Sequence, residues 1–250
     1  MAQIKVRGIV LEQAPMGEKD KRLVVLTREM GKISVLAKGA KSQAGRQAAP
    51  AQLFCVADYV LDRGKTFYYI KEYEILGSFY SLRTDLDRFA YASVMLEFAR
   101  IFSLDGEENE SLFTLLVRGL YAMQKEKVDY RTICHTYLLR LLSENGFQPE
   151  LSSCTRCGRS YDQTEGWFFN AEEGGLVCPE CHRFEKSEVS PGTVRAMQYI
   201  ISAEQASVYR FSAAENLQRE LVRPIRESAI LHAGFTPKSL DFVENLENMG

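Results

Sequence analysis

The sequence predicts an α+β fold of three parts: a small β-rich domain, a helical domain, and a cysteine module inserted into the helical domain. Three observations predict it. Residues 3–80 alternate apolar and polar positions in short runs, as β-strands do. From residue 82 onward the apolar positions recur with the period of about 3.6 residues of an α-helix. Four of the six cysteines form two C-x-x-C pairs between residues 154 and 181.

The β-rich part reads as five strands joined by recognisable turns. We expect the strands over residues 3–11, 21–27, 33–37, 53–61 and 66–76. Gly31 can take the positive φ that a hairpin loop needs. A loop rich in Gly, Ala, Lys and Arg follows the third strand, over residues 38–50. Five short strands with a long loop after the third predict a closed OB-fold barrel over residues 1–80.

The helical part is marked by its start and stop residues. Helices are expected over residues 85–103, 111–125 and 129–144, with Gly146 as the stop of the third. Ser190 and Pro191 predict the N-cap and first position of a helix that ends at residue 202.

The last third of the chain carries three further signals. The spacing from Ser212 to Glu215 is that of a capping box at the start of the next helix. Pro224 should kink or break that helix, and Gly234 should stop it before a short C-terminal piece. We expect a helical domain over residues 81–149 and 188–250, with the cysteine module at residues 150–187.

The cysteine module predicts a metal site. Two residues between thiols let one tight turn aim both sulfurs at one point, and two such turns make the tetrahedral S4 cage that zinc prefers. The predicted ligands of one structural Zn²⁺ are Cys154, Cys157, Cys178 and Cys181. His182 is adjacent to a ligand, but four thiolates fill the site, so we expect it not to bind the metal.

Three alternatives to zinc are weaker. Disulfides need an oxidising compartment, and the N-terminus has no signal-peptide pattern. The C-x-x-C-H motif of haem attachment at Cys178–His182 leaves the first cysteine pair unexplained. A thioredoxin-like redox pair needs only one C-x-x-C, set in a βαβ pattern, and this sequence does not show that pattern. Cys55 and Cys134 are expected to be small buried hydrophobic residues. Reduced cysteines and no targeting segment predict the cytoplasm.

Charge is unevenly placed along the chain. Residues 1–80 hold 13 Lys and Arg against 8 Asp and Glu, whereas the remainder holds 18 against 25. A basic N-terminal part indicates a polyanion partner for that part alone. No apolar run is long enough to span a bilayer, so no membrane partner is expected.

The basic residues of the barrel predict a nucleic-acid contact. Lysines on strands and in a mobile basic loop can follow a phosphate backbone, with counterion release supplying the affinity. The candidates are Lys21, Arg22, Lys32, Lys38, Lys41 and Arg46. The alternative is a solvated barrel face with lysines that protect strand edges.

Aromatic residues of the last barrel strand are candidates for stacking on bases. Phe67, Tyr69 and Tyr73 share one face and are expected in the core, which leaves Tyr68 on the opposite face as the better stacking candidate. In the cysteine module, Trp167–Phe169 is expected to be a ribbon strand. The cations Arg156, Arg159, Arg183 and Lys186 are expected to neutralise a Zn(Cys)4 centre, with direct DNA contact as the alternative.

No catalytic site is expected. The chain has three histidines, His135, His182 and His232, and none stands in a nucleophile, metal-hydrolase or phosphate-loop motif. An unrecognised enzymatic site remains the third class of function, after nucleic-acid binding and a zinc-ribbon protein-interaction scaffold whose barrel binds protein.

These residues resemble the RecO family of recombination mediators. The runs from Gly8 to Leu11 and from Gly17 to Ser42 look like that family's N-terminal barrel. The two cysteine pairs, with Gly174 and Gly175 before the second, look like its zinc element. The order of barrel, helices, zinc element and helices is similar over essentially the whole chain.

The resemblance implies a non-enzymatic factor in DNA repair and homologous recombination. Such proteins bind single- and double-stranded DNA and anneal complementary strands, including strands coated by single-stranded-DNA-binding protein. With RecR they help load RecA onto coated gaps, which implies a cytoplasmic, nucleoid-associated protein. Carried over by position, the six basic residues of the barrel are DNA-contact candidates. The docking site for the tail of the single-stranded-DNA-binding protein is left unassigned.

Overall fold

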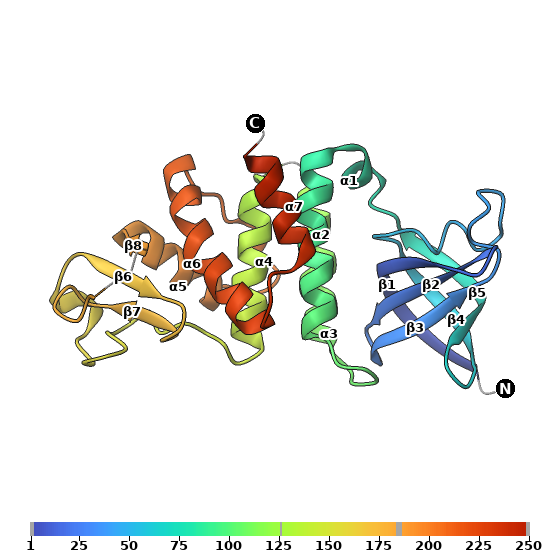
Figure 1. Ribbon diagram of the computed structural model, residues 1–250, viewed down its shortest axis with the longest axis horizontal. Coiled ribbons are helices and arrows are strands. Elements are labelled where there is room, and N and C mark those ends of the chain that lie inside the picture. The colour runs from blue at the N-terminus through green and yellow to red at the C-terminus, as the bar shows by residue number, and fades with distance from the viewer. Residues whose placement is uncertain (1–2, 126, 184–186, 249–250) are drawn as a thin grey trace. The chain divides into compact units, whose positions relative to one another are not determined.

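The protein divides into two compact units, residues 1–124 and residues 125–250, and each is described by itself. The structure is a computed structural model that describes residues 3–125, 127–183 and 187–248. The first unit holds a β-barrel and three helices. Within the described residues, the second holds four helices and a small three-stranded sheet (Figure 1).

The barrel is closed and has the strand order β1-β2-β3-β5-β4. Its strands are β1 (Gln3–Met16), β2 (Asp20–Thr27), β3 (Gly31–Ala37), β4 (Val56–Arg63) and β5 (Tyr68–Gly77). β1 pairs with both β2 and β4, which closes the sheet, and β3 runs parallel to β5. Five strands in this order confirm the predicted OB-fold.

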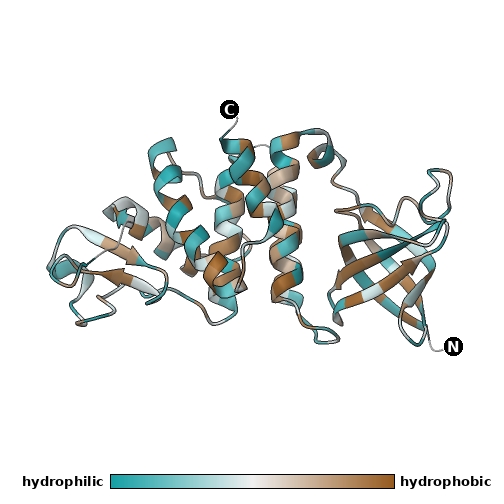
Figure 2. Ribbon diagram, in the orientation of Figure 1, coloured by the Kyte–Doolittle hydropathy of each residue, from teal (hydrophilic) through white to brown (hydrophobic). Residues whose placement is uncertain are grey.

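Alternation along the strands builds the barrel core. Val10, Leu23, Val35 and Leu61 point inward and are buried, and Tyr59 joins them while its hydroxyl donates to the Pro50 carbonyl at 2.9 Å. Figure 2 shows hydrophobic and hydrophilic segments mixed along these strands, as one buried and one exposed face require.

Two strands start later than the sequence predicts, β5 at Tyr68 and β4 at Val56. Before β4, residues 53 and 54 form a turn. The cause is Phe54, which has φ 66° and lies fully buried, edge-on to the ring of Phe89 at 5.8 Å between centroids. Burying this aromatic side chain holds the chain out of the extended conformation.

The first unit also contains α1 (Tyr80–Thr84), α2 (Leu86–Phe102) and α3 (Glu110–Gln124). α2 starts where Asp85 accepts a hydrogen bond from the Arg88 N–H at 3.0 Å. Both α2 and α3 pack on β1 and β2. The two predicted helices over 85–103 and 111–125 are therefore confirmed, with ends shifted by one residue.

The second unit is built around α4 (Tyr130–Glu144), which packs on α5 (Pro191–Ser202) and α6 (Glu215–Ala233). The remaining elements are α7 (Lys238–Glu247), the 3-10 turns η1 (Tyr161–Gln163) and η2 (Val208–Arg210), and the strands β6 (Trp167–Asn170), β7 (Gly175–Val177) and β8 (Ser187–Val189). Ser190 caps α5 and Pro191 is its first residue, as predicted. Gly146 and Gly234 follow the ends of α4 and α6 with positive φ, also as predicted.

The capping box expected for α6 and a break of the helix at Pro224 are both wrong, while a kink at Pro224 stays a prediction. The helix begins at Glu215 with Ala214 as its N-cap, so Ser212 does not form a capping box. It also continues through Pro224 without a break. Proline removes one hydrogen bond from a helix interior, at a cost of about 3 kcal/mol. Here α6 packs along α4 and buries Leu221, Pro224 and Ile225, and this packing outweighs the lost bond.

No helix within the described residues is long and apolar enough to cross a membrane.

The first testable prediction concerns Gly31, where the barrel meets the segment between α2 and α3. Gly31 has φ 57°, and a Cβ there would lie 2.1 Å from the carbonyl oxygen of Glu107 and 2.6 Å from that of Leu104. Gly17 has φ 58° but nothing within 4 Å of its Cβ position. We expect Gly17→Ala to lower the free energy of unfolding by about 1 kcal/mol, from backbone strain alone.

Gly31→Ala should lower the free energy of unfolding by roughly 2 kcal/mol more than Gly17→Ala, because backbone atoms must also move apart. Urea titrations of both variants measure the difference. Equal losses would show that residues 104–107 do not pack tightly on the barrel.

Candidate functional site

The four cysteines of the two C-x-x-C pairs converge on one point. The sulfurs of Cys154, Cys157, Cys178 and Cys181 all lie within 4.8 Å of one another, and those of Cys157 and Cys178 are 3.7 Å apart. A zinc–sulfur bond of about 2.3 Å makes the edge of a tetrahedral ZnS4 centre about 3.8 Å long. The spacing therefore fits four thiolates around one metal ion.

Backbone hydrogen bonds build both halves of this centre. In the first turn the Gly158 N–H donates to the Cys154 carbonyl at 2.9 Å, and in the second the His182 N–H donates to the Cys178 carbonyl at 2.9 Å. The Thr155 N–H donates to the Leu176 carbonyl at 2.8 Å and joins the first turn to β7. β6 pairs with both β7 and β8, so Trp167–Phe169 is a ribbon strand as predicted.

The surroundings of the thiols favour one thiolate and oppose a second. Burial resists ionisation of Cys154, but N–H groups of Cys178, Cys157 and Arg156 point at its sulfur and bring its pKa down to about 6. Hydrogen bonds with the thiols of Cys157 and Cys178 raise the pKa of Cys181 to about 12. A bound cation stabilises all four thiolates together, so it lowers the pKa of every thiol, including those that the surroundings keep protonated.

The cations of the module are paired with its carboxylates. Arg156 binds Glu173 through Nε and Nη2, at 3.0 and 2.7 Å, and also donates to the Cys181 carbonyl. Arg159 forms an ion pair with Glu180. Arg183 is exposed, and Lys186 lies outside the described residues. Arg156 and Arg159 thus stabilise the ribbon through carboxylates, a role that neither predicted alternative included.

The three histidines lie in separate places. The His182 ring stacks on Phe168 with 3.8 Å between centroids, and that of His232 stacks on Phe147 at 4.1 Å. His135 is buried in α4, where its Nδ1 donates to the Arg131 carbonyl at 2.7 Å. Burial, with nearby Arg226, lowers the pKa of His135 to about 4. Each ring has a packing partner.

The six basic residues predicted to contact DNA fall into two groups. Lys38, Lys41 and Arg46 lie together in the loop between β3 and β4, and all three are exposed. We call residues 38–50 the basic loop. It is anchored by the Gly39 N–H, which donates to Asp20 at 2.8 Å, and by Gln47, which donates to the Ile70 carbonyl at 2.8 Å. The tethers hold the loop on the barrel and leave its three cations exposed, with the Lys41 Nζ donating to the Gly17 carbonyl.

Lys21, Arg22 and Lys32 bind groups of the protein itself. Lys21 donates to Gln13 at 2.8 Å, and Arg22 pairs with Glu12 at 3.0 Å. The Lys32 Nζ donates to the Arg100 carbonyl of α2 at 3.1 Å, and its side chain is only 25% exposed. The structure therefore does not gather all six cations on one surface. Their contacts with DNA stay predictions.

The expected orientation of two tyrosines is reversed. The pairing of β4 with β5 shifts between Leu61–Ile70 and Val60–Glu72, so Lys71 is an extra residue in β5. The alternation of faces changes at this bulge. Tyr73 packs on the core as expected, but so does Tyr68, whereas Tyr69 faces outward beneath Lys38. The predicted stacking candidate Tyr68 is wrong, because the sequence pattern does not show the bulge.

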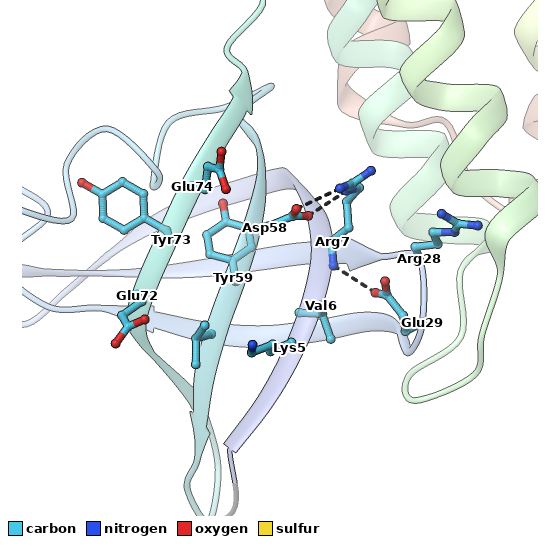
Figure 3. Close-up of a pocket in the computed structure, with 11 residues that line it drawn as sticks. Lys5, Val6, Arg7, Arg28, Glu29, Asp58, Tyr59, Glu72, Tyr73 and Glu74 are labelled. Carbon is cyan, nitrogen blue, oxygen red and sulfur yellow. Dashed lines mark hydrogen bonds and ion pairs between the residues drawn. The ribbon is translucent and has the colours of Figure 1, made fainter.

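A hollow of about 630 Å³ on the barrel surface carries mixed charge (Figure 3). Three of its lining residues are basic and four are acidic: Lys5, Arg7, Arg28, Glu29, Asp58, Glu72 and Glu74. The Arg7 Nε binds the Asp58 carboxylate at 2.7 Å, which raises the pKa of Arg7 and lowers that of Asp58. With its cations outnumbered, this surface is unsuited to a phosphate backbone.

Two parts of the chain match the two domains of one protein family. Residues 1–79 match the family described as Recombination protein O N terminal, and residues 83–241 match Recombination protein O C terminal. The chain belongs to the RecO family. This confirms the resemblance, and it makes the protein a DNA repair protein of the RecO family.

Relatives in the RecO family are similar over nearly their whole length. A protein named DNA repair protein RecO in Alkaliphilus metalliredigens is 32% identical over 231 residues, 92% of this chain and 93% of the relative. Proteins of the same name in Acetivibrio thermocellus and Clostridium kluyveri are each 30% identical. These alignments cover 100% and 98% of this chain, and 99% and 95% of the relatives.

The second prediction concerns the pH dependence that His135 gives to this RecO family protein. In the unfolded chain its pKa is near the ordinary 6.5, and in the folded chain it is about 4. The unfolded state binds more protons between these values, so stability is full above about pH 6.5 and falls as pH drops towards 4. The loss reaches about 3 kcal/mol.

His135→Gln keeps a donor for the Arg131 carbonyl and removes the titration. Urea unfolding between pH 7 and pH 4 should give a smaller loss in the variant than in the wild type. Both proteins keep the cysteines, so the difference between the two curves reports His135 alone. If the free energy of unfolding fell equally with pH in both proteins, His135 would not be buried in its neutral form.

Proposed function

We propose that this protein is a recombination mediator. In this role it binds single- and double-stranded DNA, anneals complementary strands and, with RecR, helps load RecA onto DNA coated by single-stranded-DNA-binding protein. Membership of the RecO family supports the proposal. The observation that carries it is the basic loop, which displays Lys38, Lys41 and Arg46 from one side of a closed barrel.

The geometry suggests how such a surface promotes annealing. Two DNA strands repel each other, and cations between them lower that repulsion. Lys38, Lys41 and Arg46 are on a loop and exposed, so their contacts with phosphates exchange readily and leave the bases free to pair. The mixed-charge hollow lined by Glu29, Asp58, Glu72 and Glu74 disfavours DNA there and helps restrict it to the basic loop.

The six candidate cations take unequal parts in this proposal. The three of the basic loop are exposed and have neutral partners at most: the Lys41 Nζ donates to the Gly17 carbonyl, and Lys38 lies over the Tyr69 ring. Lys21 lies beside them on β2, paired with Ala37. Arg22 and Lys32 interact with Glu12 and the Arg100 carbonyl, and these partners compete with phosphate. We therefore assign most of the DNA affinity to Lys38, Lys41 and Arg46.

We further propose that the four thiolates hold one structural Zn²⁺. The S4 donor set and its near-tetrahedral spacing suit zinc. When bound, the ion links the two cysteine turns through coordination bonds and stabilises the folded state. Nothing in the proposed function needs the metal to react, and we assign no enzymatic activity to the protein. A DNA partner supports a cytoplasmic, nucleoid-associated location, which is part of the same proposal.

The third prediction tests the basic loop. Replacing Lys38, Lys41 and Arg46 with Ala should weaken binding to single-stranded DNA and flatten its salt dependence. The logarithm of the binding constant falls as the logarithm of the salt concentration rises, and each lost phosphate contact makes this slope shallower by about one. Fluorescence anisotropy of a labelled oligonucleotide at several salt concentrations measures the slope.

The control changes the same charge elsewhere in the first unit. Lys5, Lys71 and Arg118 are also exposed, and replacing all three with Ala removes three positive charges outside the basic loop. The control should keep most of the slope. If both triple variants lose it equally, the affinity comes from net charge and not from the loop. If the wild type binds no DNA at low salt, the scaffold alternative is favoured.

The fourth prediction tests the metal. The purified protein should contain about one zinc per chain, and Cys154→Ser or Cys178→Ser should remove it. Zinc supplies on the order of 10 kcal/mol in small zinc-dependent folds, so both variants should lower the melting temperature of the second unit. Elemental analysis and thermal unfolding measure the two effects.

His182→Ala is the matched control, because it removes the side chain next to Cys181 but no thiol. It should keep its zinc. Cysteine variants that stay fully folded yet lose DNA binding would contradict a structural metal. Annealing of coated strands, with and without RecR, tests the mediator role as a whole, and nucleotide hydrolysis by the pure protein would revive an enzymatic function.

A further inference from the structure

A second hollow lies on the outer surface of the barrel where β3, β4 and β5 meet. Its volume is about 850 Å³. The charged side chains that line it are Lys38, Asp62, Arg63 and Lys65, three basic and one acidic. The mixed-charge hollow has four acidic and three basic residues, so the two surfaces of the barrel have opposite character. This second hollow suits an anionic ligand.

An aromatic ring stands in the wall of this hollow. Tyr69 is paired with Leu36 of β3 on one side and with Asp62 of β4 on the other, and it faces outward. Its ring packs closely on Gly64, where an added Cβ would lie 2.5 Å from the ring atom Cε2. The Gly64 N–H donates to the Phe67 carbonyl at 3.0 Å and closes the hairpin. The absence of a side chain at Gly64 thus lets the ring rest on the hairpin.

One cation lies over the ring, and two more line the hollow. The Lys38 Nζ lies 5.1 Å from the centroid of the Tyr69 ring, within the range of a cation–π interaction. Arg63 and Lys65 flank Gly64 and are exposed. Within the described residues, neither forms an ion pair with an acidic side chain. Unpaired cations next to an aromatic ring match the two needs of a nucleotide: a stacking surface for the base and positive charge for the phosphates.

We propose that this hollow is a base-stacking subsite for single-stranded DNA, in which one unpaired nucleobase displaces the Lys38 ammonium from the face of Tyr69 and lies there, while the adjoining phosphates contact Lys38, Arg63 and Lys65. The proposal rests on the proposed function and adds a site to it. Lys38 is the first residue of the basic loop, so a strand held here continues directly towards Lys41 and Arg46.

The site discriminates between the two forms of DNA. In a duplex both faces of each base are covered by neighbouring pairs, so only an unpaired base can lie on Tyr69. Phosphate contacts are available to both forms. A single subsite of this kind favours capture of the strand before pairing, and the base leaves the ring when the complementary strand pairs with it.

A matched tyrosine elsewhere in the first unit serves as the control. The guanidinium of Arg83 lies 5.2 Å from the centroid of the Tyr80 ring, so Tyr80 has the same kind of cation–aromatic pair. Tyr80 is 64% exposed and lies on α1, away from the second hollow. Tyr80→Leu removes an equivalent ring without touching the subsite.

The experiment compares Tyr69→Leu, Tyr69→Phe and Tyr80→Leu in the full-length protein, with oligothymidylate and with a duplex of equal length. Stacking of one base adds roughly tenfold or more to affinity. We expect Tyr69→Leu to bind oligothymidylate about tenfold more weakly and the duplex within about twofold of wild type. Tyr69→Phe keeps the ring and should bind like wild type, as should Tyr80→Leu.

Tyr69→Trp provides a direct readout and does not depend on loss of affinity. The natural Trp167 is 3% exposed, so its emission is a constant background. Stacking of a base on the new indole should quench its emission with oligothymidylate and much less with duplex.

Three results would overturn the proposal. Equal weakening for single strand and duplex in Tyr69→Leu assigns the ring a structural role. Unchanged affinity in Tyr69→Leu, with no quenching in Tyr69→Trp, excludes stacking, while DNA binding by the wild type leaves the proposed function intact. A wild type that binds neither DNA removes the proposed function and this subsite together.

Discussion

Closure of the barrel depends on a single strand. β1 is 14 residues long and pairs with β4 along Gln3–Ile9 and with β2 along Gly8–Met16. A bulge at Leu11 lets it bend between the two partners. Because β1 pairs with β4 on one side and with β2 on the other, the paired segments of β1 present no open edge to other chains.

This closure also determines where the basic residues can stand. β3 and β4 are not neighbours in the barrel, so the connection between them must pass over one end. Residues 38–55 make that connection, and Gly39, Gln47 and the buried Phe54 attach it to the barrel. Lys38, Lys41 and Arg46 are carried on its solvent side. The opposite arrangement holds for Arg22 and Lys32, whose partners are Glu12 and α2.

The four-thiol centre of the second unit solves a different problem. β6, β7 and β8 have four, three and three residues, too few to bury a core of their own. The two cysteine turns and the ion pairs of Arg156 and Arg159 hold this small sheet together, and β8 packs on α5 and α6. The metal centre thereby supports the ribbon, and the proposed DNA surface lies in the other unit.

Local sequence patterns were sufficient to predict the features that depend on neighbouring residues. The C-x-x-C spacing predicted the convergence of four thiols, apolar alternation predicted the barrel, and Ser190 and Gly146 marked helix ends, because each of these depends on local backbone geometry. Which side chains stay exposed depends on long-range packing and strand pairing. The bulge at Lys71 turns Tyr69 outward and Tyr68 towards the core. Packing on α4 lets α6 continue through Pro224. The Lys32 side chain donates a hydrogen bond to α2. Those outcomes depend on partners far away in the chain, which a local pattern does not contain.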